Sequence, residues 1–419
     1  MAEKALIGQE IVLHEAVDRA PGAYARVFRC QIRGLSQLST IKLMRSEHYR
    51  IDPADLSNKW YVESFATEAK ILAQLAQANA PCLTKLIGCG YINSAKQPVS
   101  DLYKPGSGLA KEADAIIEGL ADSNAIIYSP EEVDSFSECV DSAYLERRLP
   151  FLLLELRNEP TIFDVAQGLF NFGRGLRFPV VEIIDFIYQA GRLLEISHSC
   201  NIVYRDFKLA HYHWDGQQLY MIDWNSSAFI DPNISSIQQA KARAKDVRDL
   251  VCSLVPLFTG RPYGSLSFFA DPSLPFRVET RFENPQPIQW DESDVHIGEL
   301  LEEWVNRGVR AEFAQVSDLI NALHDVEAEE WGTLDGVDDR AMARNFLQLA
   351  VVNLRKGQAL LHHSPDEVRY FYKESEKNLF DALDVNIYAP GTAPYLECKR
   401  LFKLVSRMLA NNNLGAVLP

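Results

Sequence analysis

The stretch "NIVYRDFKLAHYHWDGQQLYMIDWN", residues 201–225, decides the fold. One aspartate, Asp206, stands near its start, and a second, Asp223, stands near its end. Between them lie two short apolar and aromatic runs separated by Asp-Gly, a dipeptide that favours a tight turn between antiparallel strands. The pattern predicts a loop, a strand, a turn and a second strand, with a carboxylate at either end.

The composition is that of a soluble globular protein. The chain has 419 residues, of which 47% are hydrophobic and 24% charged, enough for two or three domains with substantial cores. The net charge is −15, which disfavours broad binding to nucleic acid or to anionic lipid. We therefore expect no nucleic-acid partner, and a bound nucleotide would need local cations.

We expect neither a targeting segment nor a membrane-spanning segment in this sequence. The first residues, "MAEKALIGQE", are charged and unlike a secretory signal, and no apolar run approaches the roughly 20 residues that span a bilayer. The seven cysteines are scattered without a C-x-x-C pair. They indicate reduced thiols that pack as small hydrophobes, so we expect a cytoplasmic protein.

The chain before the quoted stretch reads first as strands and one helix. Strand patterns fill residues 9–45, interrupted by a small-residue turn at residues 20–23, and a further strand region covers residues 82–92. An apolar stripe predicts a helix at about residues 60–78.

Residues 93–148 differ in character, with eleven acidic and five basic residues. "SPEEV" at residues 129–133 has a helix-start signature, in which Ser129 caps the helix and Glu132 completes a capping box. We predict a partly helical insertion here, with disorder as the alternative.

The chain after the insertion is mostly helical. "RLPFLLLELRNE" predicts a buried strand that leads into a connector, and Pro256 should kink or end the helix that contains it. The helices expected in this part lie at residues 180–199, 244–258, about 297–307 and 315–328.

The last part of the chain predicts three amphipathic helices after a hinge. They fill residues 340–361, 365–384 and 394–411, and the second opens on Ser-Pro-Asp-Glu, another capping box. Two interpretations stay open: a tetratricopeptide-like array, or a plain helical cap on the core.

The order of charged residues indicates phosphoryl transfer. That reaction needs a group that positions the acceptor hydroxyl, cations on the phosphates, and carboxylates that hold metal ions. The chain offers, in order, Lys42, Glu68, Asp206, Lys208 and Asp223. Taken singly, Lys42 and Glu68 could be a surface ion pair, Asp206 could cap a turn, and Asp223 could end a strand.

Taken together and in this order, these motifs resemble the eukaryotic-like (Hanks-type) protein kinase superfamily over about residues 10–330, apart from the insertion. The resemblance implies an α+β, bilobal protein-kinase-like fold with an insertion in the N-lobe and a C-terminal all-helical extension. The implied boundaries are 1–92 for the N-lobe, 93–148 for the insertion, 149–333 for the C-lobe and 334–419 for the extension.

The resemblance also implies roles for the charged residues. Lys42 matches the lysine that contacts the α- and β-phosphates, and Glu68 matches the helix glutamate that pairs with it. Asp206 matches the aspartate that accepts or orients the substrate hydroxyl, and Lys208 the lysine typical of Ser/Thr kinases. Asp223 matches the aspartate of the metal-binding D-F-G motif.

Further positions match the parts of the family that hold the nucleotide. Gly22 and Val27 belong to the phosphate loop. Glu155 and Arg157 lie in the hinge, where the backbone would bond the adenine edge, and His213 falls at the floor beneath adenine. In addition, "DVRDLVCSLVPLFTGRPYG" resembles the helix that anchors the C-lobe, with Asp246 as the buried aspartate beneath the catalytic loop.

The chain departs from the family's pattern around the phosphates. The phosphate loop keeps only Gly22 of its three glycines, and Pro21 removes a backbone N–H. His211 replaces the asparagine that ligates a second magnesium, although imidazole suits softer metals. A transition-metal site built from His211, His213 and Asp223 is one alternative, and a hydrogen-bonded His211 lining a pocket is the other.

A second group of departures concerns the activation segment. D-F-G reads Asp-Trp-Asn at residues 223–225, and no A-P-E motif lies between Asp223 and Asp246. Phe313 stands near the position of the arginine that would pair with the A-P-E glutamate. The peptide-docking platform of the family is therefore expected to be truncated.

Three functions stay open. The leading one is an atypical Ser/Thr protein kinase that uses ATP with Mg²⁺ or Mn²⁺ and recruits a protein substrate or partner through the insertion or the C-terminal helices. The second is a pseudokinase scaffold for protein partners. The third is a small-molecule kinase, which "IDW" and the short segment favour and Lys208 disfavours.

Overall fold

The computed structural model of the chain describes residues 5–7, 11–17, 24–33, 38–45, 48, 59–93, 116, 120, 123–163, 180–215, 218–259, 287–288, 290, 297–330, 350, 353, 365–384 and 393–410. Gly22, Pro21 and most of the helix predicted at residues 340–361 lie outside these ranges. The chain forms two compact units: Met1–Asn158 with Ile196–Tyr204 and Met221–Phe229, and Glu159–Glu195 with Arg205–Tyr220 and Ile230–Pro419.

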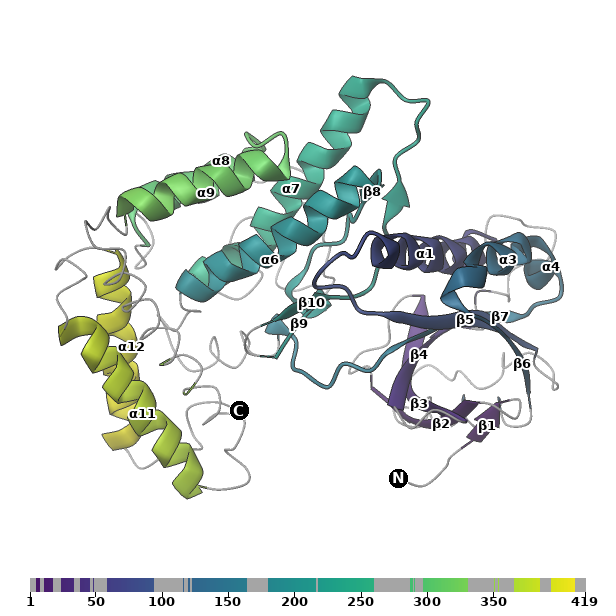
Figure 1. The fold of residues 1–419 in the computed structure, drawn as a ribbon, viewed down its shortest axis with the longest axis horizontal. Helices are drawn as coiled ribbons and strands as arrows, with labels where there is room; N and C mark the ends of the chain where they lie inside the picture. The colour runs from purple at the N-terminus through teal and green to yellow at the C-terminus, as the bar shows by residue number, and fades with distance from the viewer. Residues whose placement is uncertain are drawn as a thin grey trace, which may run out of the picture. The chain divides into compact units, whose positions relative to one another are not determined.

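The first unit is built on a curled antiparallel sheet (Figure 1). Its described strands lie in the order β1-β2-β3-β4-β7-β5-β6. Their bounds are β1 Ala5–Ile7, β2 Ile11–Ala16, β3 Ala25–Ile32, β4 Leu38–Met44, β5 Leu86–Asn93, β6 Asn124–Tyr128 and β7 Leu149–Glu155. The strands predicted within residues 9–45, 82–92 and 148–159 are confirmed, and the fold is a mixture of helix and sheet as expected.

The sheet extends past the predicted lobe boundary at residue 149. β7 lies between β4 and β5 and pairs antiparallel with both, so it is an interior strand of this sheet and not the start of a second lobe. The physical reason is its apolar sequence, since Phe151, Leu152 and Leu153 are almost fully buried and a strand with two apolar faces belongs in the middle of a covered sheet.

Helix α1 (Lys59–Gln77) packs against this sheet, as the apolar stripe predicts. Its buried side chains include Phe65, Ala69 and Leu72. Glu68 is buried on the same helix, which an apolar stripe alone would not place in a core. Glu68 is one of the candidate site residues.

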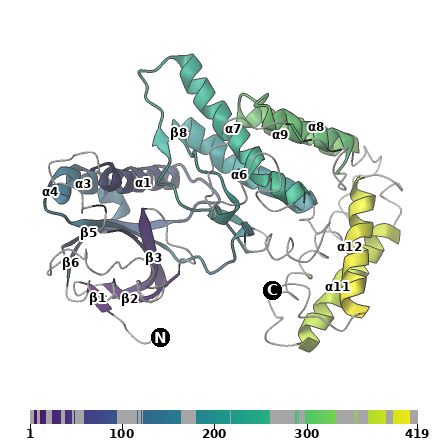
Figure 2. The same ribbon diagram turned by 180° about the vertical axis from the view of Figure 1, so that it is seen from behind.

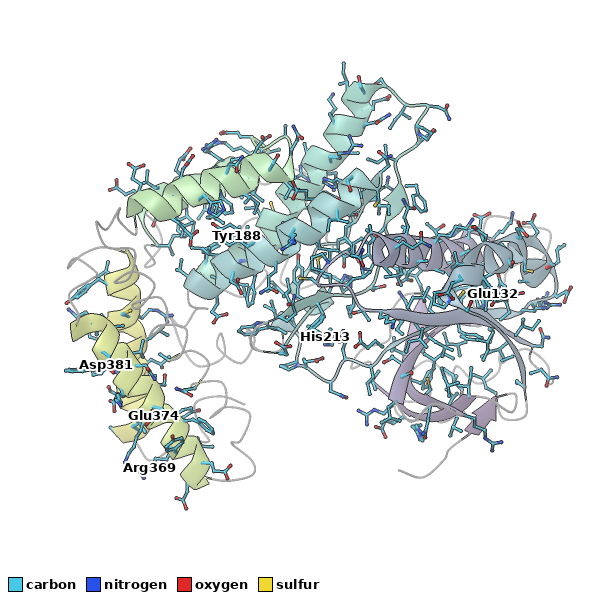
Figure 3. All side chains as sticks on the ribbon, viewed as in Figure 1. Glu132, Tyr188, His213, Arg369, Glu374 and Asp381 are labelled. Carbon is cyan, nitrogen blue, oxygen red and sulfur yellow. The ribbon has the colours of Figure 1, made fainter. Side chains whose placement is uncertain are left out.

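The segment predicted as a partly helical insertion adds a strand and helices to the first unit. β6 pairs with β5 at the edge of the sheet and was not predicted. The short 3-10 helix η4 (Pro130–Glu132) follows, and its start is the predicted capping box, in which the Ser129 backbone N–H donates to Glu132 Oε2 at 2.9 Å (Figure 3). The capping prediction is therefore confirmed.

Two short helices of this segment lie beside α1. They are α3 (Val133–Glu138) and α4 (Val140–Leu145). Lys59 on α1 pairs with Asp141 at 2.5 Å, Lys70 pairs with Asp134 at 3.3 Å, and the Tyr91 hydroxyl of β5 donates to the backbone oxygen of Phe136 at 2.9 Å. The described part of the segment is thus bound to the sheet and to α1.

The second unit is mainly helical. Helix α6 (Val180–Ser199) has the predicted bounds, and the hairpin strands β9 (Tyr212–Trp214) and β10 (Leu219–Met221) pair as the Asp-Gly turn predicts. At the turn, the Gln218 backbone N–H donates to Asp215 Oδ1 at 2.7 Å. Helices α8 (Glu299–Val309) and α9 (Val316–Glu330) confirm the two closing helices.

Helix α7 is longer than predicted. It runs over Ser236–Thr259, begins before residue 244 and contains Pro256 without ending there. Its first turns are polar and show no apolar stripe, but they are capped: the Gln238 backbone N–H donates to Ser235 Oγ at 3.3 Å, and Ser235 N–H donates to Gln238 Oε1 at 3.1 Å. This capping box was the signal that hydrophobic periodicity overlooked.

The C-terminal part contains the predicted pair of helices, α11 (Pro365–Asp384) and α12 (Ala393–Ala410). They run antiparallel, because Phe380 packs on Phe402 at 6.4 Å between ring centroids and the Ser406 hydroxyl donates to Glu376 at 2.5 Å (Figure 1). In the described part of the chain, no helix is both long enough and apolar enough to cross a membrane.

Candidate functional site

The centre of the first unit is a buried ion pair between β4 and α1. Lys42 lies opposite Val27 of β3 and Leu152 of β7 in the sheet. Its Nζ donates to both carboxylate oxygens of Glu68, at 2.9 and 2.8 Å. Lys42 is 6% exposed and Glu68 is 1% exposed, so this is not the solvated surface pair that either residue would form by default.

Asp223 joins this pair through the same ammonium. Lys42 Nζ lies 2.5 Å from Asp223 Oδ1. The backbone N–H of the next residue, Trp224, donates to Glu68 Oε1 at 3.1 Å. Asp223 has a φ of 62°, in the left-handed region that aspartate visits more readily than most residues. This backbone turn brings both Asp223 and the Trp224 amide to the ion pair.

The pKa values in this cluster follow from burial and charge. Burial by itself would lower the pKa of Lys42, but the negative charges of Asp223 and Glu68 outweigh it and raise that pKa. Burial raises the pKa of Glu68, and the charge of Lys42 opposes that rise. Lys42 therefore keeps its positive charge although its side chain is largely removed from water.

Tyr204 and Trp224 support the turn that carries Asp223. The Tyr204 hydroxyl donates to the backbone oxygen of Ile222 at 2.7 Å, and its ring packs on Trp224 edge to face at 4.7 Å between centroids. The Ser227 hydroxyl donates to the backbone oxygen of Tyr204 at 3.0 Å. These supports were not predicted, although the aromatic residue of "VYRD" and the tryptophan of "IDW" were their signal in the sequence.

The loop of the second unit holds Asp206, Lys208 and His211. Lys208 Nζ donates to Asp206 Oδ2 at 3.0 Å. The Arg205 backbone N–H donates to Asp246 Oδ1 at 3.0 Å, and Arg205 has a φ of 70°. Asp246 is 1% exposed on α7. A buried carboxylate therefore fixes the strained backbone directly before Asp206.

His211 is buried beside Asp206. Its Nδ1 lies 3.0 Å from the backbone oxygen of Asp206, which can only accept, so Nδ1 carries the hydrogen. The same nitrogen lies 3.8 Å from Asp206 Oδ2. A neutral imidazole in this tautomer presents Nε2 as its lone-pair nitrogen, and through Nδ1 it helps to hold the Asp206 backbone.

His213 has a different environment from His211. His211 ends the 3-10 helix η5 (Leu209–His211) and His213 lies on β9, so the alternation of a strand does not relate their side chains. Figure 3 labels His213. Its Nδ1 bonds the backbone oxygen of Glu159 at 2.8 Å. The transition-metal site that combines both histidines stays a prediction.

Val27, Glu155 and Arg157 are the other described residues that were expected to bind the nucleotide. Val27 lies on β3 opposite Lys42. Glu155 ends β7 and forms an ion pair with Arg157, while its backbone N–H donates to the oxygen of Lys85 at 2.9 Å. Glu155 and Arg157 thus engage each other through their side chains.

An aromatic cluster next to the predicted phosphate loop was also missed. Tyr24, directly before β3, contacts Trp60 edge to face at 5.2 Å and Tyr61 at 5.7 Å, both in the first turn of α1. His48 stacks on Tyr61 at 3.6 Å between centroids. The rings connect the strand after residues 20–23 to the helix that carries Glu68.

Two sets of candidate residues therefore emerge, each within its own unit. Lys42, Glu68 and Asp223 form one set, and Asp206, Lys208 and His211 form the other. The aspartate carboxylates offer the oxygen ligands that magnesium prefers. The imidazole of His211 is the nitrogen group in these two sets that can ligate a metal, since a charged lysine has no lone pair to offer. The donor types fit a divalent cation at Asp223 better than a purely nitrogen-bound metal.

The comparisons with known proteins identify no family. No family model matches the chain, and no curated protein matches it either. Among solved structures, the chain is similar to the PknI kinase domain of Mycobacterium tuberculosis, with a TM-score of 0.43 and 12% identity over 78% of this chain and 98% of that chain. A likeness of that size carries no argument about function, so the case for function depends on the residues themselves.

Proposed function

We propose that the chain is an atypical ATP-dependent phosphotransferase of the protein-kinase type, which transfers the γ-phosphate of ATP to a Ser or Thr hydroxyl of a protein. The observation that carries the proposal is the buried cluster in which Lys42 contacts both Glu68 and Asp223. A lysine kept cationic in a largely buried position is suited to bind phosphate oxygens.

Each residue has a defined part in the proposed reaction. Glu68 holds the Lys42 ammonium in place, and Lys42 binds the α- and β-phosphates of ATP. Asp223 would hold a magnesium or manganese ion, which neutralises phosphate charge when bound. Asp206 orients the acceptor hydroxyl and takes its proton, while Lys208, 3.0 Å from Asp206, screens charge on the transferred phosphate.

The reaction balances without any further reagent. The acceptor oxygen forms a bond to the γ-phosphorus as the bond from that phosphorus to the β-γ bridging oxygen breaks. The hydroxyl proton passes to Asp206, and the leaving group is ADP. The hydrogen bond from the Arg205 backbone N–H to Asp246, directly before Asp206 in the chain, supports the assignment of this role to Asp206.

A second candidate is a scaffold that binds protein partners without transferring phosphate. The observation that favours it is the direct contact of Lys42 with Asp223, because each group neutralises the other and so offers less to phosphate and to metal. His211 also favours a scaffold, since its Nδ1 is hydrogen-bonded to the Asp206 backbone and imidazole is a poor magnesium ligand.

One assay separates the two candidates. The purified protein is incubated with labelled ATP and Mg²⁺ or Mn²⁺, beside Asp206→Ala, Asp223→Ala and the matched control Asp215→Ala, which alters an exposed turn of the same hairpin. We expect transfer to fall at least about a hundredfold in the first two variants and to persist in the control.

Equal background transfer in all four proteins would overturn the phosphotransferase proposal. A melting temperature that ATP and metal raise in the wild type would then indicate a nucleotide-binding scaffold, and an unchanged melting temperature would indicate a nucleotide-free one. Transfer that reaches only metabolites would replace the protein hydroxyl by a small-molecule acceptor.

A further inference from the structure

A groove runs between α8 and α9, the last two helices of the second unit before residue 331. The helices follow each other across a short turn at residues 310–315 and lie side by side (Figure 2). The Trp304 indole N–H of α8 donates to the backbone oxygen of Leu319 on α9 at 3.2 Å and joins the pair. The groove has a volume of about 490 Å³.

The floor of the groove is apolar. Trp304 contributes from α8, and Ala322 and Val326 contribute from α9, where their spacing places them on one face. Trp304 is almost fully buried, so its position is fixed by the core beneath. Such a floor between two helices can accept an apolar side chain of a third helix.

The rim of the groove is acidic. Among the described residues that line it, four carboxylates face one guanidinium: Glu303, Asp318, Asp325 and Glu329 against Arg307. Arg307 is already engaged, since its Nε lies 3.4 Å from Glu312 and its guanidinium lies over the Phe313 ring at 4.8 Å from the centroid. The groove therefore presents negative charge to an approaching molecule.

Two of the carboxylates have no ionic partner among the described residues. Glu303 pairs with Arg310 at 2.7 Å, and Asp318 accepts the Gln315 backbone N–H at 3.1 Å. Asp325 and Glu329 are exposed and stand four residues apart on α9. Like charges at this spacing repel each other and destabilise a helix unless cations compensate them.

We propose that this groove is a docking site for a Lys- and Arg-rich amphipathic helix of a partner protein. An apolar side chain of that helix fills the floor at Ala322 and Val326, and its cations meet Asp325 and Glu329. Charge complementarity selects this occupant, because an anionic segment would be repelled and an uncharged helix would leave the two carboxylates without partners. The inference does not depend on the proposed transfer reaction.

The test uses a labelled synthetic peptide of leucine, lysine and arginine, with the leucines at helical spacing, and a scrambled peptide of the same composition. Binding to the full chain is followed by fluorescence anisotropy. We expect Asp325→Lys/Glu329→Lys to weaken binding about tenfold, since each exposed ion pair contributes a small increment. Added salt should weaken the wild-type complex in the same sense.

The control is Asp134→Lys/Glu138→Lys on α3, which has the same residue types, the same spacing and the same change of charge at another exposed helix face. It also breaks the exposed pair of Asp134 with Lys70, which contributes little to stability. We expect this control to bind within about twofold of the wild type. Equal weakening in both double variants would mean that the peptide responds only to the net charge of −15, and the proposal would fail.

A further variant tests the floor. Ala322→Trp fills the groove, so binding of the amphipathic peptide should be lost while weak binding of the scrambled peptide stays unchanged. If circular dichroism shows that this variant does not fold, the charge variants decide alone. Self-association of the chain that Asp325→Lys/Glu329→Lys abolishes, without any peptide binding, would assign the groove to a second copy and overturn the proposal.

Discussion

Lys42 and Glu68 form a two-point contact in the interior of the first unit, with the ammonium 2.9 and 2.8 Å from the two carboxylate oxygens. The contact joins the middle of the sheet to the helix that covers it. Both groups lose their water on folding, so each depends on the other to compensate its charge. The stability of this unit and its proposed phosphate site therefore share one interaction.

Removal of the Glu68 carboxylate should lower the free energy of unfolding. Glu68→Gln removes one of the two carboxylates that compensate the buried ammonium of Lys42 and leaves only the partly exposed Asp223. We expect a loss of about 3 kcal/mol in the free energy of unfolding, because breaking a buried ion pair by removing one partner is costly. The control is Glu63→Gln on the same helix, where Glu63 and Lys59 form an exposed pair at 3.2 Å. That variant should lose less than about 0.5 kcal/mol in urea unfolding. Similar losses in both would contradict the buried role of Glu68.

Gly90 on β5 should not tolerate a side chain. A Cβ there would lie 2.0 Å from the backbone oxygen of Ile126 and 2.6 Å from the Phe151 ring. We expect Gly90→Ala to destabilise the protein by at least about 3 kcal/mol in urea unfolding, because a backbone oxygen cannot move aside like a flexible side chain.

Gly88 on the same strand is the comparison for Gly90. Its Cβ would come no closer than 3.0 Å to the backbone oxygen of Tyr128, so Gly88→Ala should cost clearly less. A larger loss of stability in Gly88→Ala than in Gly90→Ala would contradict the close approach of Ile126 to Gly90.

His211 should influence the choice of metal if the proposed reaction is correct. Asparagine offers an oxygen ligand, so His211→Asn should raise transfer with Mg²⁺ relative to Mn²⁺. The control is His213→Asn, because His213 bonds the backbone of Glu159 instead of Asp206. The readout is the ratio of the two metal-dependent rates in each protein. A ratio that His211→Asn leaves at the wild-type value would place His211 away from the metal.

The buried thiols should resist alkylation. Burial raises the pKa of Cys89 from its ordinary 9.0 to about 12, and burial has the same effect on Cys30 and Cys252. Cys139 and Cys200 are partly exposed. Limited iodoacetamide treatment of the native protein, followed by mass spectrometry, should modify Cys139 and Cys200 first. Early modification of Cys89 would contradict its burial.

The same thiols make stability depend on pH. The folded-state pKa of Cys89 lies above the unfolded value, so its contribution is fully present below pH 9.0 and is lost as the pH rises toward about 12. The free energy of unfolding should therefore fall across that interval. Replacement of Cys89 by alanine should flatten part of the decline in a urea series at different pH.

The regular elements were predicted well where one pattern dominated. α6 and the strands around Lys42 have clear apolar patterns, and their positions agree with expectation. The start of α7 was missed because its first turns are polar, and β6 was missed because a short edge strand carries little pattern of its own. In both cases the decisive stabilisation comes from a cap or from a neighbouring strand.

In the candidate site, too, some features were predicted from the sequence and others were not. The order of the charged residues carried the resemblance to the protein kinase superfamily. That resemblance implied the pairing of Lys42 with Glu68 and made Asp206, Lys208 and Asp223 candidates. The direct contact of Lys42 with Asp223 and the Trp224 amide on Glu68 had no signal in the sequence. A hydrogen-bonded His211 was one of the alternatives, but its partner, the Asp206 backbone oxygen, was not predicted.

The sequence by itself determined the strands and helices that have a clear apolar pattern and the charged groups that are available for chemistry, since these depend on local periodicity and residue type. Only the tertiary structure decided that Glu68 is buried, that Asp223 turns toward Lys42 and that Asp325 and Glu329 line a groove. The physical reason is that burial and charge compensation arise between segments far apart in the chain, where no local pattern can record them.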